Sequence, residues 1–129
     1  MHARHAAPTD DLTTLWPKLR EVKVNHEQVL VAVDEENQLH AGVLCWDGGH
    51  DYVYVGEFVV RPAEDPKPSY VAAKLLMQTL MMWARQRGRT HLLFVSADNL
   101  FMANALRSGA ELLGTVALFK IEVKELWKP

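Results

Sequence analysis

Apolar and β-branched residues in the first half of the chain fall into three short runs separated by polar residues. The runs cover residues 29–33, 39–46 and 52–61, and residues 34–37 and 47–50 between them favour turns. Runs of this length and composition are typical of antiparallel strands joined by hairpins. The pattern therefore predicts a three-stranded meander.

A single glycine interrupts the third of these runs. Gly56 stands among aromatic and β-branched residues that would otherwise alternate between the two faces of a sheet. Glycine inside a strand often marks a β-bulge or a close approach of another backbone or a ligand. We expect one of these features at Gly56.

The pattern then changes from the strand period to the helix period. Residues 61–69 contain three prolines and predict an irregular loop. Apolar residues at helical spacing follow it, and Ser69 and Gly88 are suitable residues to begin and end that helix. The wide apolar stripe predicts a helix that is largely buried against the sheet.

Shorter patterns complete the second half of the chain. Residues 91–95 are predicted to be a buried strand, and residues 99–108 a helix that Gly109 ends. Residues 115–123 alternate in polarity and predict a last strand.

The amino end predicts two short helices before the meander. Asp10 supplies a start signal and Trp16 ends the first helix, because Pro17 interrupts the pattern and favours a second start. The complete order predicts a mixed α/β (α+β) fold, in which the meander leads into a right-handed, parallel strand–helix–strand crossover.

Composition narrows the class of protein. The 129 residues are 49% hydrophobic and 23% charged, which predicts a single globular domain over residues 1–129. A formal charge of −2 leaves no basic surplus for a nucleic-acid backbone. The only cysteine, Cys45, favours a reducing, cytoplasmic setting, and no apolar stretch is long enough for a membrane span. The six histidines lack metal-ligand spacing, so no metal is expected.

Five short segments, taken in order, resemble the motifs of the GCN5-related N-acetyltransferase (GNAT) superfamily. The segments are Arg4–Asp10, Phe58–Pro62, Leu76–Gly88, Val95–Asn99 and Gly109–Gly114. The resemblance covers most of the chain and depends on order and spacing, since none of the segments is specific by itself. It implies a mostly antiparallel central sheet with splayed fourth and fifth strands and helices on both faces.

The resemblance also implies a binding site for acetyl-CoA. In that family the pantetheine arm hydrogen-bonds to exposed backbone between the splayed strands, which corresponds here to Val59 and Val60. The diphosphate of CoA lies at the start of the long helix, where unpaired N–H groups favour an anion. The residues that match that region are Lys67, Ser69, Tyr70, Val71, Ala72, Ala73 and Lys74. Asn99 matches an asparagine that caps the next helix or contacts CoA.

Two positions depart from the family pattern. The segment Pro68–Ala73 contains no glycine where the family has several, so side chains replace an open backbone surface. Many members also have a tyrosine that protonates the leaving thiolate, and the matching residue here is Ala105. A thiol pKa near ~8.5 allows a thiolate to leave without such an acid.

Glu57 is the candidate catalytic base. An amine acceptor with a pKa near ~10.4 is protonated at neutral pH and must lose a proton before it attacks. Members of the family often have an acid at this place in the fourth strand. The alternative is an acid on the solvated side of a strand. Strict alternation puts Tyr54, Phe58 and Val60 on one face and Glu57 on the opposite face, which argues against the catalytic role unless a bulge intervenes.

The favoured function is therefore an acyl-CoA-dependent N-acyltransferase that acetylates an amine of a small molecule or a protein by direct attack. The alternative is a catalytically inactive, GNAT-like module of phage type that binds a protein partner. Trp127, beyond the last predicted strand, indicates a partner or dimer contact. A monomer and a homodimer both stay open.

Overall fold

The structure is a computed structural model of the chain, and it describes residues 1–17, 25–62, 64–94, 103, 105–107 and 109–111. The chain forms two compact units, residues 1–94 and residues 95–129. Three of the predicted features lie outside the described residues: the strand at 115–123, Asn99 and Trp127. The second helix predicted to start at Pro17 extends into residues that are not described.

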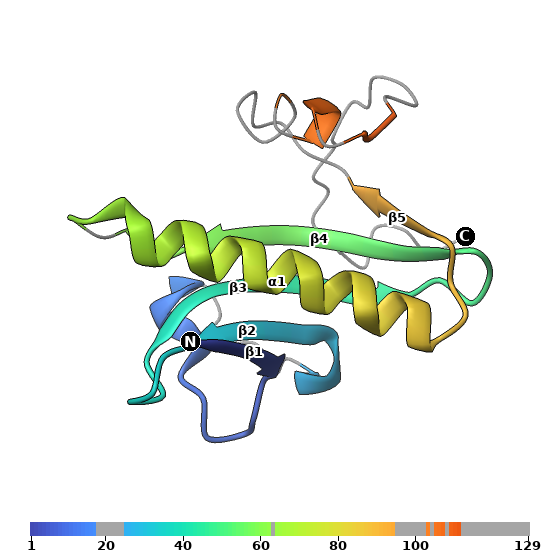
Figure 1. Ribbon diagram of the computed structural model, residues 1–129. Coiled ribbons are helices and arrows are strands. Elements are labelled where there is room, and N and C mark those ends of the chain that lie inside the picture. The colour runs from blue at the N-terminus through green and yellow to red at the C-terminus, as the bar shows by residue number, and fades with distance from the viewer. Residues whose placement is uncertain (18–24, 63, 95–102, 104, 108, 112–129) are drawn as a thin grey trace, which may run out of the picture. The chain divides into compact units, whose positions relative to one another are not determined.

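The first unit is a five-stranded sheet with one long helix (Figure 1). The sheet contains β1 (His2–His5), β2 (Val29–Val33), β3 (Leu39–Asp47), β4 (Tyr52–Val60) and β5 (His91–Phe94), in that spatial order. Neighbours pair antiparallel from β1 to β4, and β5 pairs parallel to β4. The predicted meander and the parallel return strand are confirmed.

The predicted irregularity at Gly56 is a β-bulge. On β3, Val43 pairs with Phe58 and Cys45 pairs with Val55, so Leu44 alone lies opposite both Gly56 and Glu57. Because of the extra residue, the side chains of β4 after the bulge point to the faces opposite to those that regular alternation would give.

The helix α1 (Pro66–Gln86) crosses one face of the sheet (Figure 1). Its buried residues pack against the apolar side chains that β2, β3 and β4 present to that face. The helix residues that are buried are Ala72, Leu76, Leu80 and Ala84. Their spacing of three to four residues forms the stripe that the sequence predicts.

The predicted start of α1 was wrong by one turn. The helix begins at Pro66 rather than Ser69, because Asp65 is its N-cap and accepts a hydrogen bond from the Lys67 amide at 3.1 Å. An N-cap Asp followed by proline in the first turn is a favoured helix start, which outweighs the loop tendency of the prolines. Ser69 lies inside the helix, where its hydroxyl donates to the carbonyl of Arg61.

The carboxyl end of α1 is fixed to the β3–β4 hairpin by ion pairs. Arg87 Nε lies 2.7 Å and Arg89 Nε 2.6 Å from the two carboxylate oxygens of Asp47. These guanidinium groups, with the Gly49 amide, hold the pKa of Asp47 well below its usual range. Gly88 has a φ of +74°, so the helix stops there as predicted.

A second apolar cluster covers the other face of the sheet. Leu12, Leu15 and Trp16 pack with the β2 residues that point away from α1. The segment is shorter than predicted, because only Leu12–Thr14 forms a helical turn, a 3-10 turn capped by Asp11. Asp10 is not the cap; its carboxylate accepts from the Ala7 amide and pairs with Arg4.

Little of the second unit is described. Ala105 lies in a short helix, whose end has the hydrogen bonds from Gly109 to Leu106 and from Ala110 to Ala105 that are typical of a glycine-terminated helix. The predicted helix end at Gly109 is confirmed. Across the described parts of both units, no helix combines the length and apolar character that crossing a membrane requires.

Candidate functional site

The outer edge of β4 pairs with a described strand only in its first half. Its ladder with β5 runs from Tyr52–His91 to Val55–Phe94, and Phe94 is the last residue of β5 that the structure describes. Figure 1 shows β5 leaving the line of β4 toward its carboxyl end. No described residue pairs with Val60 on that side. Since the Arg61 amide donates to His40 on β3 and successive residues of a strand bond to opposite sides, Val60 directs its N–H and C=O to this edge and Val59 bonds toward β3.

The bulge determines which side chains of β4 face α1 and which point to the opposite face of the sheet. Val53 and Val55 face α1 before the bulge, whereas Phe58 and Val60 face it afterwards. Glu57 consequently shares the opposite face with Tyr54 and Val59. The expectation that Tyr54 and Phe58 share a face was wrong, because it assumed regular alternation.

Glu57 is exposed on β4, two residues beyond Val55, which is the last residue of β4 that pairs with a described residue of β5. Among the described residues, none makes a hydrogen bond or an ion pair with its carboxylate. The carboxylate is therefore free to accept a proton from a molecule bound on this face or from an intervening water.

Two aromatic rings lie beside the bulge on the face of Glu57. Trp46 and Tyr54 are directly opposite each other on β3 and β4, and their rings stack with centroids 5.9 Å apart. A Cβ on Gly56 would lie 3.2 Å from the Trp46 ring, and one on Gly48 only 2.4 Å from the Tyr54 ring. These glycines let the rings lie close to the backbone, while 42% of Trp46 and 37% of Tyr54 stay exposed.

The start of α1 offers few free amides. An α-helix leaves four N–H groups without internal partners at its start, which here belong to residues 65–68. Pro66 and Pro68 have no N–H, and the Lys67 amide already donates to Asp65. Only one of the four, that of Asp65 itself, remains.

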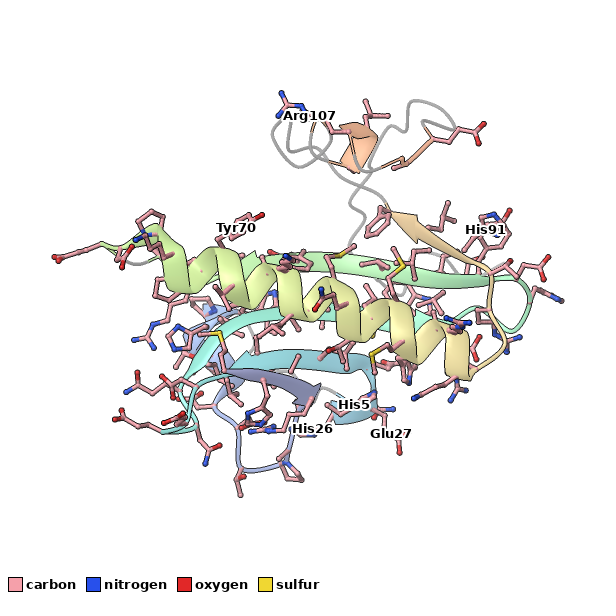
Figure 2. The ribbon with its side chains drawn as sticks, in the orientation of Figure 1. His5, His26, Glu27, Tyr70, His91 and Arg107 are labelled. Carbon is pink, nitrogen blue, oxygen red and sulfur yellow. The ribbon has the colours of Figure 1, made fainter. Side chains whose placement is uncertain are left out.

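The residues expected to contact a diphosphate lie deeper in the helix. The segment from Tyr70 to Lys74 follows the first helical turn, where each amide donates to the carbonyl four residues before it. Ala72 is fully buried in the core, Ala73 is half-buried, and Val71 is exposed. Figure 2 shows Tyr70 projecting from α1, and 71% of it is exposed.

The site thus fits one part of coenzyme A and not another. The edge at Val60 suits the amide groups of a pantetheine arm. The helix start does not suit a diphosphate, because the carboxylate of Asp65 already occupies the position in which an anion would bind. Lys67 and Lys74 are exposed and are the cations nearest this position in sequence on α1.

The remaining predicted residues have simple placements. Ala105 occupies the helix where the family tyrosine would be and offers no hydroxyl. Cys45 is buried in the core, where burial raises the pKa of its thiol to about 11. It is therefore a protonated thiol at neutral pH rather than a nucleophile.

A polar hollow of about 400 Å³ lies elsewhere, between the turn after β1, the β2–β3 hairpin and the end of β4. Its two aspartates and two arginines include the Arg4–Asp10 pair, which neutralises itself. It contains none of the predicted site residues. The described residues include no cluster of three or more His, Cys, Asp or Glu side chains suited to a metal ion.

Sequence reasoning missed the Asp65 cap and the Trp46–Tyr54 stack. The cap had a signal, since an acidic residue immediately precedes a proline at position 66. The stack had none, because it depends on which residues β3 and β4 place opposite each other.

Comparison by sequence finds no counterpart. No protein-family model matches the chain, and no curated protein matches it significantly.

Comparison by structure finds many similar proteins. A Trypanosoma brucei acetyltransferase has a TM-score of 0.66 at 12% identity, with 93% of this chain and 99% of that chain covered. An aminoglycoside 6′-N-acetyltransferase from Acinetobacter haemolyticus has a TM-score of 0.60 at 20% identity, covering 96% and 100%.

A third similar structure is N-acetylglutamate synthase from Neisseria gonorrhoeae, crystallised with coenzyme A and N-acetylglutamate. Its TM-score is 0.58 at 19% identity over 81% of this chain. The match spans only 27% of the length of that synthase. Identities at this level establish a shared fold.

Proposed function

We propose that this chain, which has the fold of the GNAT superfamily, transfers an acyl group from a pantetheine thioester to an amine. The observation that carries the proposal is the bulge in β4. It puts an exposed carboxylate, Glu57, on β4 between the described ladder with β5 and Val59 and Val60. A base beside an open strand edge is what such a transfer needs.

Glu57 is proposed to act as the general base. An alkylamine is an ammonium ion at neutral pH, and its nitrogen cannot attack until it loses a proton. Glu57, directly or through one water, accepts that proton. The thioester supplies the acyl group, and formation of the amide C–N bond accompanies cleavage of the C–S bond.

The departing thiol needs no acid from this chain. Ala105 cannot donate a proton, but a thiolate whose conjugate acid has a pKa near ~8.5 leaves unaided and is protonated by solvent. The absence of the family tyrosine at this position is therefore compatible with the proposed chemistry.

The acceptor is proposed to approach over the Trp46–Tyr54 stack. Exposed aromatic faces attract ammonium ions, and the neighbouring carboxylate of Glu57 adds to that attraction. The acceptor class is therefore a cationic amine, carried either by a small molecule or by a lysine side chain of a protein.

A donor and acceptor panel tests the proposal. The purified protein is incubated with acetyl-CoA or S-acetylpantetheine and with polyamines, aminoglycosides, arylalkylamines and a lysine peptide, while thiol release is followed. We expect release that depends on the amine and that E57Q abolishes, whereas E35Q, which removes an exposed acid in the β2–β3 turn, retains it. Amine-dependent release with neither donor would contradict the proposal.

The exposed aromatic cluster also favours a second candidate, a non-catalytic module that binds a protein partner. Tyr52, Trp46 and Tyr54 are all more than a third exposed on one side of the sheet. This candidate predicts a stoichiometric complex that Trp46→Ala weakens and that acetyl-CoA does not affect, together with no acyl transfer. A partner whose binding competes with an amine acceptor would instead support the enzyme.

A further inference from the structure

Polar groups at the start of α1 already have hydrogen-bond partners within the protein. Its N-cap carboxylate, on Asp65, accepts the Lys67 amide at 3.1 Å, and the hydroxyl of Ser69 donates to the carbonyl of Arg61 at 3.1 Å. The Lys67 amide, which could donate to an anion at the helix start, is thus already bonded within the protein.

The remaining donors at this start are absent for a covalent reason. Proline has no N–H, and prolines occupy two of the four positions whose amides an α-helix leaves free. A small rearrangement of side chains cannot restore these two donors.

The negative charges next to the start of α1 also disfavour binding of a diphosphate there. Asp65 and the neighbouring Glu64 are both exposed acids immediately before the helix. A carboxylate at a helix start gains from the helix dipole in the same way as a phosphate does, so the two compete for one position. The cations Lys67 and Lys74 lie in the helix beyond the cap and balance these acids.

The strand edge presents the opposite situation. No described residue pairs with Val60 on the outer side of β4. The Arg61 amide donates to the His40 carbonyl on β3, and successive residues of a strand bond to opposite sides, so Val60 directs its N–H and C=O to the outer edge while Val59 bonds toward β3. A pantetheine arm carries two amides spaced along an extended chain, which is the chemistry that an open strand edge recognises.

We infer that the protein recognises its acyl donor by the pantetheine arm and that the start of α1 does not bind the nucleotide diphosphate of coenzyme A. The inference rests on the proposed function and specifies the donor of the same site. The chemical class is an acyl-pantetheine thioester, whether it belongs to coenzyme A or to the phosphopantetheine group of a carrier protein.

Kinetics with two donors test this inference. We expect kcat/KM for S-acetylpantetheine to lie within about a factor of three of that for acetyl-CoA, because the start of α1 gives the diphosphate no contact. A diphosphate held by charge-assisted hydrogen bonds gains roughly tenfold to a hundredfold from each bond, so a preference of that size for acetyl-CoA would overturn the inference. An acetylated carrier protein as a third donor identifies the natural source of the arm.

Calorimetry separates failure of this inference from failure of the proposed function. Binding is measured for pantetheine, for coenzyme A and for its nucleotide half, adenosine 3′-phosphate 5′-diphosphate. We expect equal affinities for the first two and no heat from the nucleotide, even if no amine is acetylated. Heat from the nucleotide, or much tighter binding of coenzyme A, overturns the inference whatever the acyl transfer assay shows.

A designed variant tests the stated cause. Asp65→Ser with Pro68→Ala keeps a capping side chain, removes the charge and restores one amide. We expect the preference for acetyl-CoA over S-acetylpantetheine to rise about two- to fivefold. The matched control E64Q removes the adjacent acid, which does not cap the helix, and should change the preference less. Equal ratios in both variants would contradict the role given to Asp65 and Pro68, and circular dichroism checks that each variant is folded.

Discussion

The two halves of β4 have the same neighbour on one side and different surroundings on the other. Residues Tyr52–Val55 pair with both β3 and β5, and every second side chain is buried. After the bulge at Gly56, the strand keeps β3, no described residue of β5 pairs with it, and none of its last five residues is fully buried. The first half contributes buried side chains to the core, and the second carries the proposed base Glu57.

The bulge separates these roles. An unpaired strand edge and an exposed acid each cost a sheet some stability, and a strand interior tolerates neither easily. The bulge shifts the register between β3 and β4 at one residue, so the exposed acid Glu57 lies directly after a well-packed segment. Substitutions in the two halves should therefore affect different measurements.

The largest effect is expected from E57Q in the second half. Loss of a general base lowers kcat/KM by roughly 10²- to 10⁴-fold. The free energy of unfolding should not change measurably, because no hydrogen bond or ion pair from a described residue holds this side chain. An E57Q enzyme with wild-type kcat/KM would remove Glu57 from the mechanism.

The first half should show the reverse with V53A. Val53 is fully buried against α1, so truncation costs about 1.5–3 kcal/mol of stability. At temperatures well below unfolding, kcat/KM should stay close to wild type. Urea denaturation and initial rates measure the two effects, and a large loss of kcat/KM in folded V53A would contradict the division of β4.

A side chain at the boundary should strain the bulge itself. In G56V the new Cβ would lie 3.2 Å from both the Leu44 Cβ and the Trp46 ring, and the remaining methyl groups need more room. We expect a loss of about 1–3 kcal/mol and a change in tryptophan fluorescence. Adding Leu44→Ala should recover part of the loss, and no recovery would show that the strain lies elsewhere.

The smallest effect concerns the hairpin before β4. Arg89, the Gly49 amide and Arg87 lower the pKa of Asp47 in the folded protein. The ionised carboxylate therefore stabilises the fold fully at pH values above the pKa of Asp47 in the unfolded chain, near ~3.9. This stabilisation is lost as the pH falls through the lower pKa of the folded protein. D47N should lower the urea midpoint at pH 7, and the difference from wild type should shrink steadily below about pH 4.

The control for D47N is D51N, which removes another acid from the same hairpin. Among the described residues no ion pair joins Asp51, so the urea midpoint of D51N should change less than that of D47N at pH 7. A D47N difference that is the same at pH 3 and pH 7 would show that the ion pairs with Arg87 and Arg89 do not stabilise the fold.

Much of the fold follows from local patterns. Turn residues separate the runs that become β2, β3 and β4, and the apolar stripe of α1 with Gly88 at its end predicts a buried helix and its stop. These features depend on periods of two and 3.6 residues and on residues that fit special backbone angles, all of which are visible in sequence.

Where the sequence prediction was wrong, neighbours in space decided the outcome. The helix after residue 8 shrinks to a 3-10 turn at Leu12–Thr14, because the Asp10 carboxylate binds Arg4 and the Ala7 amide instead of capping. The turn then serves to bury Leu12, Leu15 and Trp16 on the sheet.

By itself, the sequence determined β2 to β5, the long helix and the glycine at which β4 could bulge, since each follows from polarity and backbone preference along the chain. Only the tertiary structure decided that Leu44 faces both Gly56 and Glu57, that Trp46 stacks on Tyr54, and that Asp65 closes the start of α1. The reason is that strand register and helix capping depend on which groups from different parts of the chain meet in space. The alternation of polar and apolar residues along one strand does not specify which residues of the neighbouring strand lie opposite.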